Sequence, residues 1–301
     1  MLPRDFALLL VVCLVWASNF VVSKLAVSAL AAPPLFFSAA RLGVVLLCVL
    51  PWLFPMPRPR WRMVVIGLLM GAGSFGLMNV GLMTATPSSA AVLVQLGVPI
   101  TTLLSVVILG ERIGRLRGLG IALTFAGAVT VMWDPHGFTF SVGLLFVLGN
   151  AFCTSLGAVM MKQTRGVRPL QFQAWVGLSS VLPLAALSAV LETRQIPLAL
   201  EGGWAFLAVV LYAALGVSVF GHTLYFGLIQ KYEANLIASL TLMCPLMAIG
   251  LGVALTGDPF DARMMLGTAV VLAGVLLILL APKRAAAAAK GLAAPTARKS
   301  P

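Results

Sequence analysis

The sequence predicts an all-α polytopic membrane protein, with ten transmembrane helices arranged as two inverted five-helix repeats around a central cavity. Three observations lead to this fold class. First, 61% of the 301 residues are hydrophobic and only 9% are charged, which is more apolar than any soluble core requires. Second, an apolar run with a central proline at 87–112 returns at 233–258. Third, the basic residues gather in alternate loops, as they do in multi-pass membrane proteins.

Ten apolar stretches are long enough to be transmembrane helices. About 20 residues, each rising 1.5 Å, cross the roughly 30 Å of lipid hydrocarbon. In order along the chain, we expect the spans at roughly 6–29, 34–54, 63–84, 87–109, 116–133, 141–161, 170–191, 203–228, 234–256 and 263–281.

The fourth and ninth spans carry the repeat most clearly. Pro245 follows Pro99 by 146 residues. Each proline removes one helix hydrogen bond and is expected to kink its span. The spans that follow them have matched glycines at an offset of 147, which predict close helix packing: Gly120 and Gly127, then Gly267 and Gly274.

The distribution of positive charge predicts the orientation. With the N-terminus inside, sixteen of the 20 basic residues fall in cytoplasmic segments, and the outer loops hold only Arg194 and Arg263. Both termini are therefore expected in the cytoplasm. Because five is an odd number, the second repeat starts on the opposite side of the membrane and is inverted. The expected units are 1–135, 136–284 and a basic, low-complexity tail at 285–301.

Composition also bears on other classes of function. The net charge is +12. The basic residues that produce it lie in loops beside the spans rather than on one face, so we expect no nucleic acid partner. The sequence contains no phosphate-binding loop, nucleophile elbow or metal-ligand cluster, so we expect neither enzyme activity, nor a cofactor, nor a metal. The first span is expected to be retained rather than cleaved, since Lys24 and its length do not fit a signal peptide.

Polar side chains inside spans are the candidate site residues. A polar group in hydrocarbon costs free energy unless it is paired, so each is expected to point inward. For about half of them, helix–helix contact is the expected role instead. The expected substrate-binding residues are Trp16, Asn19, Met78, Asn79, Gln95, His222, Tyr225, Ser239 and Thr241, and the expected hinge residues are Pro99 and Pro245.

Charged side chains inside the spans are few, and no span interior holds a carboxylate. Arg41 is interpreted either as a cation that attracts a substrate carboxylate or as one that extends to the outer surface; for Lys24 the second reading is favoured. Transport is then facilitative or coupled through another group. His222 could titrate, but a neutral, hydrogen-bonded ring is favoured. Glu111 is expected to form a loop ion pair, for example with Arg115.

Several segments resemble the EamA-type drug/metabolite transporters. They are WASNFVVSKLAV (16–27), PPLFFSAARLGVVLL (33–47), PSSAAVLVQLGVPITTLLSVVILGERI (87–113) and, in the second half, YEANLIASLTLMCPLMAIGLGVALTGDPF (232–260). The resemblance covers nearly all of the chain to about residue 282 and is nearest to aromatic amino acid exporters of the YddG type. It implies a ten-helix carrier of the bacterial inner membrane, whose cavity is lined by spans 3, 4, 8 and 9 with spans 1 and 6 beside them. The ninth span departs from the pattern, ending in Gly257-Asp258-Pro259 rather than Gly-Glu.

Together these observations predict an inner-membrane exporter that moves aromatic or large neutral amino acids and related metabolites by alternating access. Its partners are expected to be the small-molecule substrate and the lipid bilayer, and it is expected to work as a monomer. Two alternatives stay open: efflux of hydrophobic drugs or other small metabolites, and a non-transport membrane scaffold.

Overall fold

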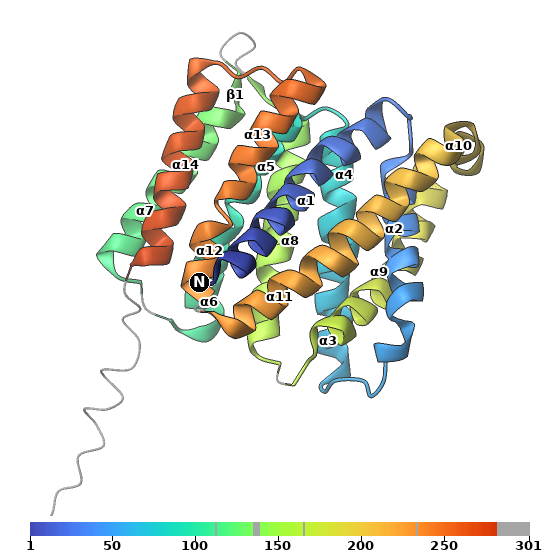
Figure 1. The fold of residues 1–301 in the computed structure, drawn as a ribbon, viewed down its shortest axis with the longest axis horizontal. Coiled ribbons are helices and arrows are strands. Elements are labelled where there is room, and N and C mark those ends of the chain that lie inside the picture. Colours follow the sequence, from blue (N-terminus) through green and yellow to red (C-terminus); the bar gives the residue numbers. More distant parts are fainter. Residues whose placement is uncertain (112, 135–138, 165, 233, 282–301) are drawn as a thin grey trace, which may run out of the picture.

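The structure is a computed structural model that describes residues 1–111, 113–134, 139–164, 166–232 and 234–281. This part of the chain is almost entirely helical (Figure 1). The expected tail at 285–301 and the expected boundary between residues 135 and 136 lie outside the described residues.

The elements follow one another along the chain in this order: α1 (Pro3–Ser28), α2 (Pro34–Val49), the 3₁₀ turn η1 (Leu50–Trp52), α3 (Arg60–Gly67), the π-helix η2 (Leu68–Gly73), α4 (Ser74–Leu82), α5 (Pro87–Val94), α6 (Gly97–Leu109), α7 (Arg115–Met132), β1 (Trp133–Asp134), β2 (Thr139–Phe140), α8 (Val142–Lys162), α9 (Pro169–Leu191), α10 (Gln195–Leu211), the π-helix η3 (Tyr212–Gly221), α11 (His222–Lys231), α12 (Ala234–Leu240), α13 (Met243–Thr256) and α14 (Ala262–Leu280). The two short strands pair antiparallel.

Ten helices or helix combinations in the described residues are long and apolar enough to cross a membrane, which confirms the predicted number of spans. The eighth, Gln195–Tyr225, has 31 residues and would be about 46 Å long if it were straight, well above the hydrocarbon thickness. A non-helical residue, Gly203 with φ 49°, divides it. Before that point Arg194 pairs with Glu201 at 2.7 Å. The apolar helix thus begins at Gln195, earlier than the predicted span of 203–228.

The start of α1 and the end of α14 lie at the same end of the helix bundle (Figure 1). The ends of α6, α8 and α11 and the starts of α3 and α7 lie there as well. We call it the basic end, because most of the loop arginines and lysines belong to it. The opposite end, where α1 finishes and α10 begins, is the far end.

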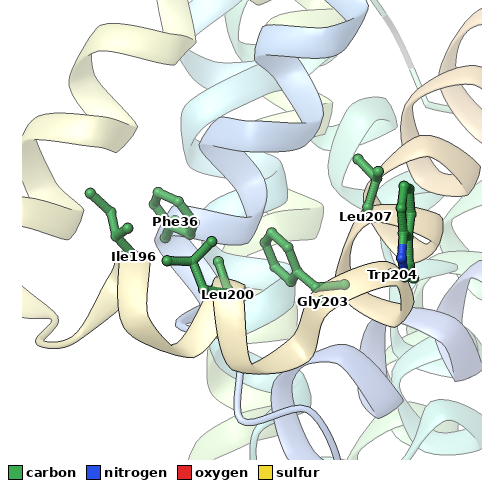
Figure 2. A pocket seen from close by; sticks show the side chains of 8 residues that line it. Phe36, Ile196, Leu200, Gly203, Trp204 and Leu207 are labelled. Atoms are coloured by element: carbon green, nitrogen blue, oxygen red, sulfur yellow. The ribbon is translucent and has the colours of Figure 1, made fainter.

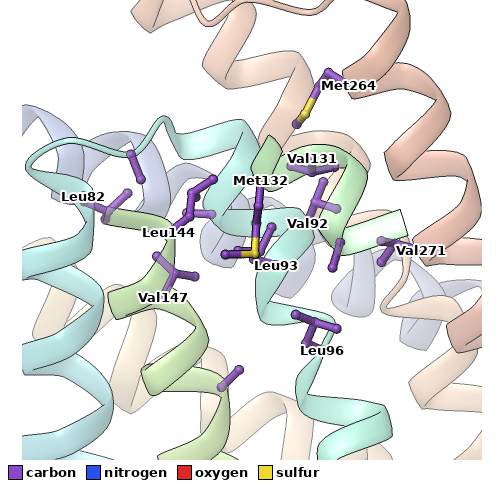
Figure 3. Close-up of a cluster of buried hydrophobic side chains, with 14 of the residues drawn as sticks. Leu82, Val92, Leu93, Leu96, Val131, Met132, Leu144, Val147, Met264 and Val271 are labelled. Atoms are coloured by element: carbon purple, nitrogen blue, oxygen red, sulfur yellow. The ribbon is translucent and has the colours of Figure 1, made fainter. Parts of the chain in front are cut away.

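A cluster of buried apolar side chains joins both halves of the chain near the far end (Figure 3). Leu93 and Val131 from the first half are packed in the same cluster as Val147 and Val271 from the second. A multi-pass chain needs such contacts because lipid gives its helices no hydrophobic drive to associate, and close packing must supply the attraction.

Helices α7 and α14 pack with their backbones close together. A Cβ atom built on Gly120 would lie 2.7 Å from the Gly274 carbonyl oxygen, and one on Gly127 would lie 2.7 Å from that of Gly267. Only glycine permits this approach of two backbones. The close packing predicted for these four glycines is therefore confirmed.

Candidate substrate-binding site

Arg41 of α2 is the most unusual side chain inside the bundle. It is 1% exposed, and its guanidinium contacts only neutral groups. Nε and Nη2 donate to Ser218 Oγ at 3.3 and 3.0 Å, and Nη1 donates to Asn19 Oδ1 at 3.4 Å. The guanidinium carbon lies 4.2 Å from the centre of the Phe75 ring, a cation–π contact. The structure thus holds a buried cation in the middle of a span.

Three further aromatic rings form a contact group that is connected to this arginine through Ser218. The Trp16 ring centre is 5.2 Å from that of His222 and 4.9 Å from that of Tyr225. His222 Nδ1 is 3.1 Å from the Ser218 carbonyl oxygen, so Ser218 contacts both the His222 ring and the guanidinium. We define the Arg41 cluster as Trp16, Asn19, Arg41, Phe75, Ser218, His222 and Tyr225.

The backbone around Ser218 explains how the cluster forms. Residues Tyr212–Gly221 form a π-helix, a rare, widened conformation that often occurs at functional sites. Ser218 Oγ donates to the carbonyl of Ala213, five residues earlier, at 3.2 Å. Gly221 lets the indole come close, since a Cβ there would be 2.8 Å from Trp16 Nε1. No periodic pattern in the sequence indicates the π-helix.

The fourth and ninth spans are broken at the places that their prolines predict. α5 ends at Val94 and α6 begins at Gly97, while α12 ends at Leu240 and α13 begins at Met243. These breaks confirm the predicted kinks.

Hydrogen bonds around the breaks show their cause. Pro99 cannot donate to the Gln95 carbonyl, which accepts from the Val98 amide at 3.1 Å instead. The Thr241 carbonyl likewise accepts from the amide of Cys244, the residue before the second proline, at 2.9 Å. Gln95 and Thr241 thus lie inside the two breaks, and the hinge role of the prolines stays a prediction.

The structure brings four of the nine expected binding residues together, namely those in the Arg41 cluster: Trp16, Asn19, His222 and Tyr225.

The other five lie elsewhere. Asn79 is buried and donates to Ser38 Oγ at 2.8 Å, and so links α4 to α2. Met78 packs against the apolar cluster of Figure 3. Gln95, Thr241 and Ser239 lie at or beside the two helix breaks; Ser239 Oγ is buried without a hydrogen-bond partner among the described residues.

Carboxylates at the helix ends were not identified as partners from the sequence. Both oxygens of Glu192 accept from the first amides of α2, those of Leu35 and Phe36, at 2.7 and 3.0 Å. Asp258 binds Ser88 at the start of α5. Each carboxylate meets the positive end of a helix dipole. In the sequence these carboxylates are marked only by their position at the ends of spans, and that position does not indicate which helix they contact.

The structure shows the partners of two charged residues that the sequence singles out, Glu111 and Lys24. Glu111 pairs with Lys162 at 3.7 Å and not with Arg115, because the end of α8 lies beside the end of α6. Lys24 donates to the carbonyls of Leu82 and Met83 at 2.9 and 3.2 Å, so its ammonium satisfies the end of α4. Its partners are thus the backbone carbonyls at a helix end, whereas those of Arg41 are side chains inside the bundle.

An open groove of about 420 Å³ lies between α10 and α2 at the far end (Figure 2). Its walls are apolar, and Trp204 is 85% exposed, as is typical of a surface that faces lipid tails. None of the predicted site residues lines it. The lining residues are Phe36, Ile196, Ala199, Leu200, Gly203, Trp204, Phe206 and Leu207.

Comparison with known families decides the class of protein. The model of the EamA-like transporter family matches residues 6–133 and again residues 141–280. The chain belongs to the EamA-like transporter family. This membership makes it a multi-pass membrane transporter and confirms the resemblance seen in the sequence.

Curated relatives cover almost the whole chain. A "Probable amino-acid metabolite efflux pump" of Salmonella typhimurium is 25% identical over 91% of this chain and 94% of its own length. The "Uncharacterized transporter YvbV" of Bacillus subtilis is 26% identical over 97% of both chains. The "Uncharacterized inner membrane transporter YedA" of Escherichia coli is 27% identical over 91% of this chain and 90% of its own.

A solved structure titled "Crystal structure of protein" has the same fold. It matches with a TM-score of 0.60 and 20% identity, covering 98% of this chain and all of the other.

Proposed function

We propose that this EamA-like transporter exports aromatic or large neutral amino acids and related metabolites by alternating access. The observation that carries the proposal is the Arg41 cluster. It combines four aromatic rings with a buried cation and neutral hydrogen-bonding groups. Such a surface suits a ligand with one apolar aromatic part and one charged part. Two relatives named amino-acid metabolite efflux pumps support the same class of substrate.

Alternating access rests on two inverted five-helix halves, 1–135 and 136–284. The family model matches once in each half. Shifted by 147 residues, the π-helix at 68–73 falls on 215–220, inside the second π-helix. The left-handed glycines Gly110 and Gly257 end the two proline-kinked spans with φ 67° and 66°. An inverted pair of such units has two equivalent states, each open to one side.

The orientation follows from the loop charges. Assigning the basic end to the cytoplasm places the N- and C-termini inside the cell, in agreement with the positive-inside rule. Relatives named inner membrane transporters support the bacterial inner membrane as the location. We expect the transporter to act as a monomer in the bilayer, because the Arg41 cluster is built from one chain.

The test is transport by the purified full-length protein in lipid vesicles. Vesicles loaded with radiolabelled phenylalanine should release it faster than empty-lipid controls, with saturation, and unlabelled tryptophan or leucine should compete. The same assay with and without an imposed pH gradient distinguishes proton-coupled from facilitative transport. Flux equal to that of protein-free vesicles over a broad panel of amino acids would overturn the proposal; changed drug resistance in expressing cells would then favour drug efflux.

A further inference from the structure

We propose that Arg41 binds the carboxylate of the transported amino acid. The inference rests on the proposed function and deepens it, because it assigns a ligand group to a residue and excludes amines and neutral amides as good substrates. Three observations about this side chain carry it.

The first observation is the lack of a counter-charge. The described part of the chain has four ion pairs, all near helix ends, and none includes Arg41. A cation in the middle of a membrane is expensive unless an anion or water compensates it. Lys24 differs, since it is only partly buried and binds the two carbonyls at the end of α4, the negative end of that helix dipole. An arriving carboxylate would supply the missing negative charge.

The second observation is the weakness of the present contacts. A guanidinium has five N–H donors, and here three of its bonds go to only two oxygens, at 3.0 to 3.4 Å. Charge-assisted bonds to a carboxylate are usually about 2.7 to 2.9 Å and can be bidentate. Ser218 Oγ keeps another partner, the Ala213 carbonyl at 3.2 Å. If a substrate carboxylate took the place of Ser218 Oγ as the acceptor for Arg41, the Ser218 hydroxyl would therefore keep its hydrogen bond to Ala213.

The third observation is the surroundings of the guanidinium. The Phe75 ring covers one of its faces at 4.2 Å, which fixes the plane in which a carboxylate can bind. The ring centres of Trp16 and Tyr225 lie 4.9 Å apart, and these rings offer apolar surface for the substrate side chain. The Asn19 oxygen that Arg41 would release can accept a hydrogen bond from the substrate ammonium. The cluster thus has a complementary group for each part of an amino acid.

The test compares ligands that differ in one group. Phenylalanine, its amide, phenethylamine and 3-phenylpropanoate are added to the purified full-length transporter, and two quantities are measured: inhibition of phenylalanine flux and the shift in thermal unfolding temperature. For the unchanged protein, we expect the two ligands without a carboxylate to bind roughly 10- to 100-fold more weakly, the usual effect of losing a charge-assisted hydrogen bond.

Variants identify the residue responsible. Arg41→Gln should bind phenylalanine and its amide equally, and Arg41→Lys should retain part of the preference. Lys24→Gln is the matched control, a cation of the same bundle that should leave the preference unchanged. Equal binding of acid and amide by the unchanged protein overturns the proposal, as does an Arg41→Gln variant that keeps the preference.

The two proposals fail in different ways. Absence of any amino acid flux in the unchanged protein contradicts the proposed function. The unfolding shift with 3-phenylpropanoate against phenethylamine still reports whether Arg41 binds carboxylates. Ser218→Ala leaves the cation in place, so if Arg41→Gln does not fold, this variant should still prefer the acid, and loss of its preference counts against the assignment.

Discussion

Ser88 donates two hydrogen bonds to one carboxylate oxygen of Asp258. Its backbone amide lies 2.8 Å and its hydroxyl 2.5 Å from Oδ2, and the carboxylate is almost buried, at 6% exposure. Residue 88 lies in the first turn of α5 and residue 258 follows the end of α13, so the contact joins the two proline-kinked spans at the far end. A negative charge at a helix N-terminus is favoured by the helix dipole.

Loss of that carboxylate should weaken the far end. We predict that Asp258→Asn lowers the free energy of unfolding by roughly 1 to 3 kcal/mol, because a buried charged hydrogen-bond acceptor is replaced by a group that can accept less. The change is measured by thermal or denaturant unfolding in detergent. Asp261→Asn is the control, because this carboxylate lies on the surface at the start of α14; a similar loss in both variants would contradict the prediction.

Added volume between α7 and α14 should be poorly tolerated. In Gly120→Ala the new Cβ would lie 2.7 Å from the Gly274 carbonyl oxygen. Gly118, two residues earlier on the same helix, has nothing within 4 Å of its Cβ position. We expect Gly120→Ala to lower stability by about 1 to 3 kcal/mol, as overpacking does, and Gly118→Ala to change it little. Unfolding midpoints and detergent-extracted yields of the two variants provide the measurement.

Removal of the prolines should straighten the breaks. Pro99→Ala and Pro245→Ala restore an amide that can bond to the carbonyl of Gln95 or Thr241, so we expect transport to fall several-fold while stability is unchanged or higher. Pro183, inside α9, is the matched control. Vesicle flux at wild-type level in Pro99→Ala and Pro245→Ala would remove the hinge role.

Gln95 and Asn79 should respond differently to alanine. Gln95 makes no side-chain hydrogen bond among the described residues and lies in a helix break, so Gln95→Ala should reduce transport with a stability change within about 0.5 kcal/mol. Asn79 is buried against Ser38, so Asn79→Ala should cost roughly 1 to 3 kcal/mol in unfolding free energy. Normal transport by a normally expressed Gln95→Ala variant would exclude Gln95 from the site.

The number of spans, the kinks and the α7–α14 glycines could be predicted because each depends on local chemistry. The length of each apolar stretch can be counted in the sequence. A proline breaks the helix that contains it, whichever neighbours that helix packs against. Partners of charged groups depend on which helix ends lie side by side. The sequence therefore predicted an ion pair for Glu111 but named Arg115 where the structure has Lys162.

The candidate site was predicted only in part for the same reason. Trp16 and His222 stand out as polar-tipped rings inside spans, and the structure places them in contact. Arg41 was recognised as exceptional, but its neutral partner Ser218 sits on a π-helix that no periodic pattern indicates. Ser218 also resembles many other small residues in the spans, so only the fold singles it out.

The glycine contacts between α7 and α14 have a consequence for assembly. Two backbones that touch at four glycines cannot slide or part without losing that contact, so we expect α7 and α14 to stay together as one unit. The same contact could hold the protein together without a continuous chain. Two separately expressed fragments, one ending after α7 and one beginning before α8, should associate in the membrane and form one functional transporter.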